Sequence, residues 1–364
     1  MLLEPVHISY SPSSSDGGIA VSISQLLEAQ QSSGIFSRWL NFDSYSFLSR
    51  DSQLKSSIDL LSPNILHLHG LWRAHTRLVA SFQSSSIPFI ISPHGMMDSW
   101  AMAHSPLKKL ISLRLWESKA FRKAACIHAL CAEEALSIRH YFPEQPIAVI
   151  PNGIKLPSLP PRDLPPPLWH EIIPPQDKVL LYLGRYHHKK GLEPLLTAWQ
   201  SLADEAIHFG WWLCFVGYGD DGKLQSQLSN FPISRCLAFG PAYNETKFSS
   251  YQHASAFILP SYSEGLPMAA LEAMSFRLPC LLSEARNLPD AFSLNAALVA
   301  EPDTSSLTHS LRKLFHLNSS SLSSMGVSAR ALVSGTYDWA TVTKQFAHLY
   351  GWVLGKNEKP SFVI

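Results

Sequence analysis

The sequence predicts an α/β protein of two domains, each built around a parallel β-sheet. Its 364 residues are too many for one ordinary core, and 46% hydrophobic with 16% charged residues is typical of a well-packed globular protein. Apolar runs of strand length recur along the chain, with room for a helix between them. Continuous apolar strands that alternate with helices favour parallel sheets covered on both faces.

The candidate strands fall into two sets, separated by a proline-rich segment. Helical patterns lie between them, for example at residues 107–122 and 192–199. The first set comprises VHISY (6–10), NILHLHG (64–70), PFIISPHG (88–95), ACIHALC (125–131) and PIAVIPNG (146–153), and the second comprises KVLLYLG (178–184), WWLCFVG (211–217), CLAFG (236–240), ASAFILPS (254–261) and LPCLLS (278–283).

The segment LPSLPPRDLPPPLW, residues 156–169, is the expected linker, because its prolines suit neither a helix interior nor a central strand. We therefore expect domains at residues 1–165 and 166–337. Residues 338–355 have the pattern of an amphipathic helix, which we expect to pack back onto the first domain. The residues after Lys356 are expected to be frayed.

Composition excludes several classes of protein. A net charge of +1 argues against a chain that wraps nucleic acid. No apolar run reaches the roughly 18 residues that a membrane-spanning helix needs, and the N-terminus lacks the basic start and long apolar segment of a signal peptide. The five cysteines are odd in number and form no C-x-x-C. A reducing, cytoplasmic location is the simplest expectation.

Ligands bind parallel sheets at the carboxyl ends of the strands, so the loops there are the places to look for chemistry. In the first domain, Gly17 and Gly18 open a helix and could let backbone approach an anion; a flexible turn with Asp16 as N-cap explains them equally well. His94 ends a strand and is a candidate site residue or a structural histidine. We expect His67 and His69 to point to opposite faces of their strand and so to form no common site.

Two loops of the second domain suit a phosphorylated ligand. Arg185 and Lys190 follow its first strand, where two cations suit a diphosphate, although a solvated basic turn has the same composition. VGYGDDG, residues 216–222, matches G-x-G-x-x-G, but no acid ends the next strand to hold a ribose. We interpret Gly217 and Gly219 as a turn that approaches a ligand closely, and not as a nicotinamide site. The adjacent histidines at 187–188 are interpreted as surface residues, so no metal site is expected.

The segment LPSYSEGLPMAALEAMS, residues 259–275, places two acids around a predicted helix start. Glu264 lies in the loop, Pro267 suits the first turn, and Glu272 lies on the second turn. Free N–H groups are expected at the helix start, from Gly265, Leu266 and Met268. Carboxylates that flank a positive helix end suit a ligand with hydroxyls at both ends and an anion between, such as a sugar nucleotide.

On these residues the chain resembles the retaining glycosyltransferases of family 4, whose GT-B fold has two facing Rossmann-like domains and a central crevice. The E-x7-E of Glu264 and Glu272 is the most specific element. The segment from LHLHGLW to ISPHGMMDSWAM is similar to bacterial enzymes of exopolysaccharide or lipopolysaccharide synthesis. The resemblance also rests on Gly17-Gly18, His94, IPNGI (150–154), GRYHHKKG (184–191) and VGYGDDG (216–222).

The resemblance implies a role for each matching position. Arg185 and Lys190 would hold the donor diphosphate, while Glu264 would contact the donor sugar and Glu272 the ribose. The chain reads EGLPMA where many relatives read EGFGLP, so the donor sugar stays open. The remaining roles are phosphate contacts for Gly17 and Gly18, a place near the reacting carbon for His94, and a place near the base for the loop from Gly240 through Tyr243 and Glu245.

The implied reaction retains the anomeric configuration without a metal. It would move a hexosyl unit from a UDP- or GDP-sugar to a glycan or lipid-linked acceptor in cell-surface polysaccharide synthesis. A catalytically silent nucleotide-sugar-binding or interaction protein on the same scaffold is the main alternative. A sugar-nucleotide epimerase or a phosphorylase ranks lower, because each needs different residues. The acceptor, the linkage and the oligomeric state stay open.

Residues 106–125, PLKKLISLRLWESKAFRKAA, carry six cations against one acid, Glu117. A basic helix with leucine, isoleucine and aromatic residues suits an anionic membrane surface. A helix packed on the first sheet with its charges solvated explains the pattern equally well. We expect peripheral attachment at the cytoplasmic face of the plasma membrane.

Overall fold

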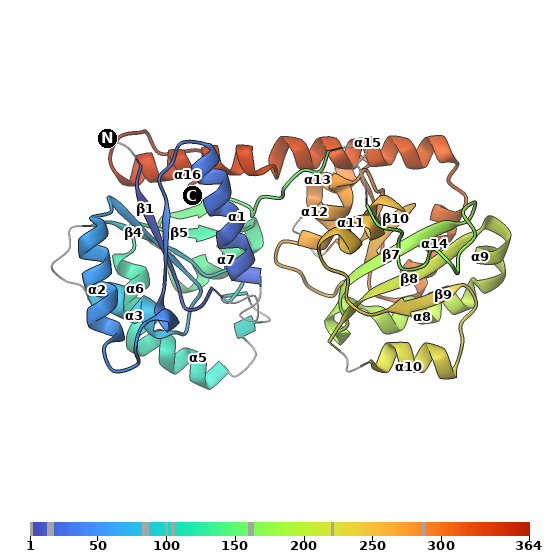
Figure 1. Ribbon diagram of the computed structural model, residues 1–364, viewed down its shortest axis with the longest axis horizontal. Coiled ribbons are helices and arrows are strands. Elements are labelled where there is room, and N and C mark those ends of the chain that lie inside the picture. The colour runs from blue at the N-terminus through green and yellow to red at the C-terminus, as the bar shows by residue number, and fades with distance from the viewer. Residues whose placement is uncertain are drawn as a thin grey trace. The chain divides into compact units, whose positions relative to one another are not determined.

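The computed structural model describes residues 3–12, 18–81, 87–98, 101–102, 106–158, 164–219, 222–284 and 288–364. The chain divides into two compact units (Figure 1), the first formed by Met1–Gly153 with Tyr337–Ile364 and the second by Ile154–Thr336. Each unit contains a six-stranded sheet in which all neighbouring strands are parallel. The predicted α/β class with parallel sheets is therefore confirmed.

The sheet of the first unit has the strand order β2-β1-β3-β4-β5-β6. The order reverses between β1 and β3, and such a reversal opens a crevice at the carboxyl ends of the two strands. The strands are β1 (Pro5–Ser9), β2 (Arg38–Asn41), β3 (Ile65–His69), β4 (Phe89–Ser92), β5 (Cys126–Ala129) and β6 (Ile147–Val149). The helices are α1 (Gly18–Ser32), η2 (Phe42–Ser44), α2 (Arg50–Leu61), α3 (Ala74–Ser81), α5 (Pro106–Ser112), the π-helical η3 (Leu113–Glu117), α6 (Ser118–Lys123), α7 (Ala132–Tyr141) and α16 (Trp339–Val353).

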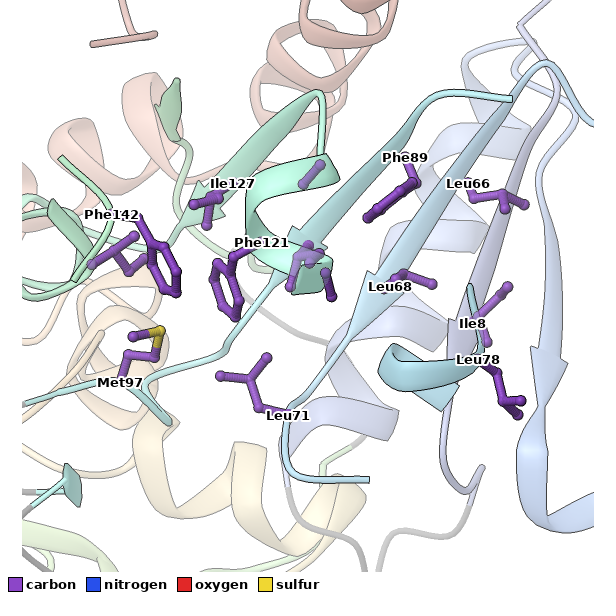
Figure 2. Packing of buried hydrophobic residues seen from close by; sticks show 14 of the residues in the cluster. Ile8, Leu66, Leu68, Leu71, Leu78, Phe89, Met97, Phe121, Ile127 and Phe142 are labelled. Carbon is purple, nitrogen blue, oxygen red and sulfur yellow. The ribbon is translucent and has the colours of Figure 1, made fainter. Parts of the chain in front are cut away.

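Alternation along the strands builds two cores, one on each face of this sheet. Leu66 and Leu68 of β3 belong to the cluster drawn in Figure 2, in which Phe121 of α6 stacks on Phe142 at 4.4 Å between ring centroids. Ile65 faces the other way, into a second cluster that includes Leu26 of α1 and five α16 residues, among them Trp339, Val342 and Phe346. Burying one such side chain contributes about 1.5–3 kcal/mol, so both faces are needed for stability.

The C-terminal residues are ordered, and the expectation of a frayed end after Lys356 is wrong. Val363 is buried and forms an antiparallel bridge with Ala148 of β6. Ile147 N–H donates to the Ile364 carbonyl at 3.1 Å, and Ile364 N–H donates to the Ile147 carbonyl at 2.9 Å. β6 is an edge strand, so the tail satisfies backbone groups that no other strand reaches.

The second unit repeats the architecture with the strand order β12-β11-β10-β7-β8-β9. Here the order reverses between β7 and β10, which places a second crevice at their carboxyl ends. The strands are β7 (Lys178–Arg185), β8 (Trp211–Tyr218), β9 (Cys236–Phe239), β10 (Ala256–Leu259), β11 (Cys280–Leu282) and β12 (Ala297–Val299). The helices are η4 (His188–Lys190), α8 (Leu192–Ser201), α9 (Ala203–Phe209), α10 (Lys223–Asn230), α11 (Asn244–Gln252), α12 (Met268–Ser275), α13 (Pro289–Ser293), α14 (Thr304–Phe315) and α15 (Ser319–Thr336).

The structure adds two strands and moves one boundary. β2 and β12, which the sequence did not predict, are short edge strands with partly exposed residues and no continuous apolar run. The first unit ends at Gly153, upstream of the expected boundary at 165. The proline-rich segment contacts the second unit, because the Pro157 carbonyl accepts from Arg330 at 2.9 Å and the Pro165 carbonyl accepts from the Ser249 hydroxyl at 2.5 Å.

Gly153 provides a test of how α16 completes the first unit. A Cβ at this position would lie 2.4 Å from Cδ2 of Trp339, within the buried indole ring. Gly153→Ala should therefore destabilise the first unit by about 1–3 kcal/mol through overpacking. Pulsed hydrogen exchange read by mass spectrometry at increasing urea reports the unfolding midpoint of each unit separately.

The matched control is Gly335→Ala on α15, where a Cβ would meet nothing within 4 Å. This change should leave its unit as stable as before or slightly more so, because alanine has the higher helix propensity. Equal midpoints for Gly153→Ala and the unmodified protein would show that the ring moves aside at no cost.

Candidate active site

The loops after β7 and β10 are tied together at the crevice of the second unit. Tyr262 N–H donates to the Lys189 carbonyl at 2.9 Å. Gly191 has a left-handed backbone with φ of 67°, and a Cβ there would lie 2.1 Å from the Pro260 carbonyl oxygen. Only glycine fits this contact. The closeness of the two loops is therefore set by the backbone.

This contact joins the predicted cation Lys190 to the predicted acid Glu264. Lys190 Nζ lies 2.5 Å from Oε1 of Glu264, and the Ser261 hydroxyl donates to the same oxygen at 2.5 Å. The two charged side chains are only 22% and 16% exposed, so their attraction is screened less than that of a surface pair. The structure thus brings together two residues that the sequence assigned to different parts of one ligand.

Glu272 has an equivalent set of partners on the neighbouring helix α11. Lys247 Nζ lies 2.7 Å from its Oε1, and the buried Tyr251 hydroxyl donates to its Oε2 at 3.0 Å. Burial, with Glu272 beside the ring, raises the pKa of Tyr251 well above its usual value, so the hydroxyl stays a donor. Sequence reasoning missed Lys247 and Tyr251, because no local motif links α11 to the acid 20 or more residues further on.

The candidate base contact Tyr243 lies just before α11 and is exposed. Lys247 N–H donates to the Tyr243 carbonyl at 3.4 Å, so the tyrosine is one helical turn from the Glu272 ion pair. The structure therefore places it beside this part of the candidate site. Its contact with a base stays a prediction.

Arg185 ends β7 with an exposed side chain, and no hydrogen-bond or ion-pair partner for it is found within the described ranges. Gly219 has φ of 108°, and a Cβ there would lie 2.9 Å from Cγ of Arg185. A Cβ at Gly217 would lie 1.9 Å from the Gly184 carbonyl oxygen. Both glycines are thus required by the chain's own packing, and their approach to a ligand stays a prediction.

The start of α12 differs from its expected form. The helix begins at Met268, and Pro267 precedes it as the capping residue. Met268 N–H donates to the Leu266 carbonyl at 2.9 Å, so the expectation that this group is free is wrong. Among the described residues, the Gly265 and Leu266 N–H groups have no backbone acceptor, which leaves two of the three expected donors.

His94 occupies a constrained turn after β4 in the first unit. Its φ of 55° is left-handed, as is the φ of 77° at Gly95. A non-glycine residue costs roughly 1 kcal/mol or more in this region, so the surroundings must hold it there. The buried Glu134 does so, because its carboxylate accepts from Gly95 N–H at 2.6 Å and from Leu130 N–H at 2.8 Å.

The expectation that His67 and His69 face opposite sides of β3 is wrong. Residues two apart on a strand share a face, and these rings lie 4.2 Å apart between centroids. His7 of β1 pairs with His67 in the sheet register and contacts His69, with 2.8 Å between Nδ1 and Nε2. His69 in turn contacts His94, with 2.9 Å between Nδ1 and Nε2. The i, i+2 spacing was the signal that could have revealed this cluster.

Burial keeps the four histidines of this cluster neutral, together with His75 and His128 of the same unit. Desolvation lowers the pKa of His7, His75 and His128 to about 4 and that of His94 to about 3. Burial, with the neighbouring rings, lowers the pKa values of His67 and His69 well below the usual value. Of the remaining first-unit candidates, Gly18 begins α1, and Gly17 lies outside the described residues.

Comparison with known proteins identifies the family. Residues 24–156 match the family profile described as Glycosyltransferase Family 4, and residues 169–331 match the profile described as Glycosyl transferases group 1. The chain belongs to the family 4 glycosyltransferases. The resemblance inferred from its motifs is therefore confirmed.

Curated relatives match only in part. TuaC of Bacillus subtilis, named for teichuronic acid biosynthesis, is 24% identical over 254 residues, which cover 66% of this chain and 58% of TuaC. The amylovoran biosynthesis glycosyltransferase AmsK of Erwinia amylovora is 26% identical over 180 residues, which cover 47% of this chain and 44% of AmsK. The chain thus spans about half the length of these two relatives.

Solved structures confirm the GT-B fold. Sucrose-phosphate synthase from Thermosynechococcus elongatus has a TM-score of 0.76 at 16% identity, covering 97% of this chain and 99% of that one. HepE of Anabaena, solved in complex with UDP and glucose, has a TM-score of 0.71 at 13% identity, covering 96% of this chain and 100% of that one. At such identities the family 4 chain shares the fold with these proteins, and nothing further follows.

The buried histidines predict a loss of stability at acidic pH. Each has a lower pKa in the folded state than the ordinary 6.5 of the unfolded chain, so only the unfolded state gains protons as the pH falls from 6.5 towards 4. A single histidine such as His7 would lower the free energy of unfolding by about 2 kcal/mol at pH 5. Glu117 and Glu134 oppose this, since burial raises their pKa to about 7 and their contribution is lost as the pH rises.

Within the described part of the first unit, six histidines have a lowered pKa, whereas only two carboxylic acids have a raised one. The free energy of unfolding of the first unit should therefore fall between pH 7 and pH 5. Pulsed hydrogen exchange at a fixed labelling pH, after equilibration in urea at each test pH, measures this. The second unit, which holds no buried histidine among its described residues, is the internal control. An unchanged or higher urea midpoint for the first unit at pH 5 would contradict the histidine account.

Proposed function

We propose that this protein is a retaining, metal-independent glycosyltransferase that moves a hexosyl unit from a UDP- or GDP-sugar to a glycan or lipid-linked acceptor in cell-surface polysaccharide synthesis. The observation that carries the proposal is the pairing of both acids of the E-x7-E with lysines, Glu264 with Lys190 and Glu272 with Lys247. The first pair lies on loops after β7 and β10, where the strand order reverses.

The charges suit a ligand with a diphosphate between two polyhydroxylated groups. Arg185 presents a planar fork of donors beside Gly219, and Lys190 adds a compact charge. A carboxylate oxygen has two lone pairs, so Glu264 and Glu272 can each hold a lysine and still accept from a hydroxyl. The lysine pairing holds both carboxylates in place before the donor arrives, which favours positioning over rearrangement.

In the proposed reaction, the bond between the anomeric carbon and the diphosphate oxygen breaks through an oxocarbenium-like state. Arg185 and Lys190 stabilise the negative charge that develops on the departing nucleoside diphosphate, which is the task of Mg²⁺ in other enzymes. A phosphate oxygen takes the proton of the acceptor hydroxyl as it attacks the same face. In this scheme the protein contributes positioning and electrostatics, and no residue forms a covalent bond with the sugar.

Two findings support a transferase over the silent binding protein. Every charged candidate residue of the second unit is present, and both acids are held by partners that a degenerate site would not need to keep. TuaC and AmsK are glycosyltransferases named for the biosynthesis of teichuronic acid and of amylovoran, and HepE was solved with UDP. The fold itself does not separate a transferase from an epimerase, so the support comes from the residues.

Attachment to an anionic membrane is part of the proposal. The basic segment forms three consecutive helices, α5, η3 and α6, and none of the described helices is long and apolar enough to cross a bilayer. Leu107, Leu110, Ile111 and Leu115 are exposed on it at a spacing that places them on one helical face. Lys108, Arg114 and Lys119 are exposed beside them. The single acid, Glu117, is buried, and its carboxylate accepts hydrogen bonds from Trp72 N–H and the Thr76 hydroxyl. The exposed surface is therefore apolar and basic.

Calorimetric titration with UDP and with GDP in the presence of EDTA tests the donor site. One of the two nucleotides should bind with micromolar affinity. Glu272→Gln should weaken this binding about tenfold or more, since it removes a charged acceptor for the ribose hydroxyls, and Arg185→Gln should do the same by removing a phosphate contact.

Glu205→Gln is the matched control for the titration. It breaks an ion pair of the same unit, with Arg312 at 2.8 Å, on helices α9 and α14. Its affinity should equal that of the unmodified protein. If the folded protein binds neither nucleotide, the donor-site assignment fails, and the interaction-protein alternative takes its place.

Flotation with liposomes tests the membrane surface. The protein should float with vesicles that contain anionic lipid at low salt and dissociate as salt is raised. A variant with Ile111→Glu and Leu115→Glu should remain unbound, whereas Leu60→Glu, which changes a still more exposed leucine on α2, should still float. Absence of the unmodified protein from the floated fraction would refute the attachment.

A further inference from the structure

A continuous chain of hydrogen bonds crosses the buried face of the first sheet and ends at His94. It links four strands to α1 and α16, and every member except His94 is fully or almost fully buried. We call it the histidine chain. In order, its members are the Ile150 carbonyl, His128, Ser92, His67, Tyr350, Gln30, His7, His69 and His94.

The half of the chain nearest Ile150 has a fixed direction. A carbonyl oxygen can only accept, so His128 must donate to it from Nε2, at 2.7 Å. A neutral imidazole has one donor and one acceptor, so His128 Nδ1 accepts from the Ser92 hydroxyl at 2.6 Å. The Ser92 oxygen then accepts from His67 Nε2 at 2.6 Å. His128 and His67 are therefore both protonated on Nε2.

The same rule carries the direction through Tyr350 and Gln30. His67 Nδ1 is left as an acceptor, and the Tyr350 hydroxyl donates to it at 2.8 Å. The tyrosine oxygen accepts from Nε2 of Gln30 at 3.3 Å, which turns the amide oxygen towards His7 at 2.9 Å. An amide oxygen only accepts, so His7 donates from Nε2.

The last links reach His94. His7 Nδ1 accepts from His69 Nε2 at 2.8 Å, and His69 Nδ1 accepts from His94 Nε2 at 2.9 Å. Among the described residues the His94 ring has no other hydrogen-bond partner. Its Nδ1 is thus the one acceptor that the chain leaves over.

We propose that the histidine chain fixes His94 as the neutral tautomer with its proton on Nε2, so that Nδ1 is presented as an acceptor for a hydroxyl group of the donor sugar. The tautomer follows from the chain alone, and the sugar contact rests on the proposed function. Seven side chains that touch no substrate act as positioning residues for an eighth. Tyr350 is the most distant in sequence, 256 residues after His94.

A metal ion is the alternative occupant of this cluster. His7, His67 and His69 each offer a ligand atom, and these atoms lie within 4.8 Å of one another. All six of their ring nitrogens already have a hydrogen-bond partner at 2.6–2.9 Å, as given above. A metal would have to break the chain at three rings, whereas the chain satisfies every buried nitrogen as it stands. The observations therefore favour hydrogen bonds over a metal.

Nitrogen-15 labelling of histidine tests the tautomer directly. Long-range proton–nitrogen spectra distinguish a protonated ring nitrogen from an unprotonated one for each histidine, assigned by single His→Gln variants. At pH 7 we expect His7, His67, His69, His94 and His128 all to be neutral and protonated on Nε2. A charged His94, or one protonated on Nδ1, would overturn the proposal.

Tyr350→Phe tests transmission along the chain. The change removes the link between His67 and Gln30, so the part from Gln30 to His94 loses its fixed direction and can invert by rotation of the amide. His94 should then show both tautomers, while His67 and His128 stay protonated on Nε2. Tyr45→Phe, which removes a hydroxyl that donates to Ser57 at 3.0 Å elsewhere in the unit, should leave every tautomer unchanged.

Several outcomes would overturn the proposal. A single, unchanged His94 tautomer in Tyr350→Phe would show that the chain does not transmit direction. If Tyr350→Phe fails to fold, Gln30→Met, a change of similar volume, removes the same link and carries the same expectation. Stoichiometric Zn²⁺ that shifts the ring nitrogens of His7, His67 and His69 together would assign the cluster to a metal.

The donor contact has its own readout. Adding a sugar nucleotide that binds in the titration should move the His94 Nδ1 signal and leave Nε2 protonated. An unmoved Nδ1 signal with a bound donor would overturn the sugar contact but not the tautomer. If no nucleotide binds, the proposed function fails while the tautomer experiment on the free protein still gives its answer.

Discussion

The first unit is governed by one constraint: both faces of a parallel sheet are covered, so a polar group placed on either face must find its partner inside the protein. Apolar residues meet this constraint by packing, as Leu66 and Leu68 do on one side of β3. His67 and His69 on the other side can meet it only through hydrogen bonds. The requirement joins strands that are far apart in sequence and gives the network its single direction.

In the second unit, two carboxylates have a similar need for partners, and ion pairs meet it. Two carboxylates near the carboxyl ends of the strands repel an anionic ligand and each other unless their negative charge is neutralised. Lys190 and Lys247 neutralise it locally. Because each lysine comes from a different loop or helix than its acid, the ion pairs also fix the spacing between elements. Gly191 and Gly217 allow the same closeness in the backbone. Electrostatics and close packing thus define the edge together.

The sequence predicted the interior of both sheets well, because buried strands carry continuous apolar runs that are visible locally. It also placed Glu264 in a loop and Glu272 on a helix from the proline between them. The edge strands β2 and β12 and the pairing of the C-terminal tail with β6 were missed, since short, partly exposed strands have no such signal. Lys247 and Tyr251 are tied to Glu272 only by the tertiary fold. The histidine cluster is a different case. The spacing of His67 and His69 is visible in the sequence, but the expectation that they face opposite sides was wrong, because residues two apart on a strand share a face.

The discontinuity of the first unit has a consequence for its synthesis. Its strands β1 to β6 leave the ribosome first, yet Trp339, Val342 and Phe346 of their second core are translated only after the whole of the second unit. Until then the polar side chains on that face lack Tyr350, and the apolar ones lack their cover. The second unit, continuous from 154 to 336, can reach its native state while the first unit still lacks α16. The half of the protein that is made first is therefore the half that is completed last.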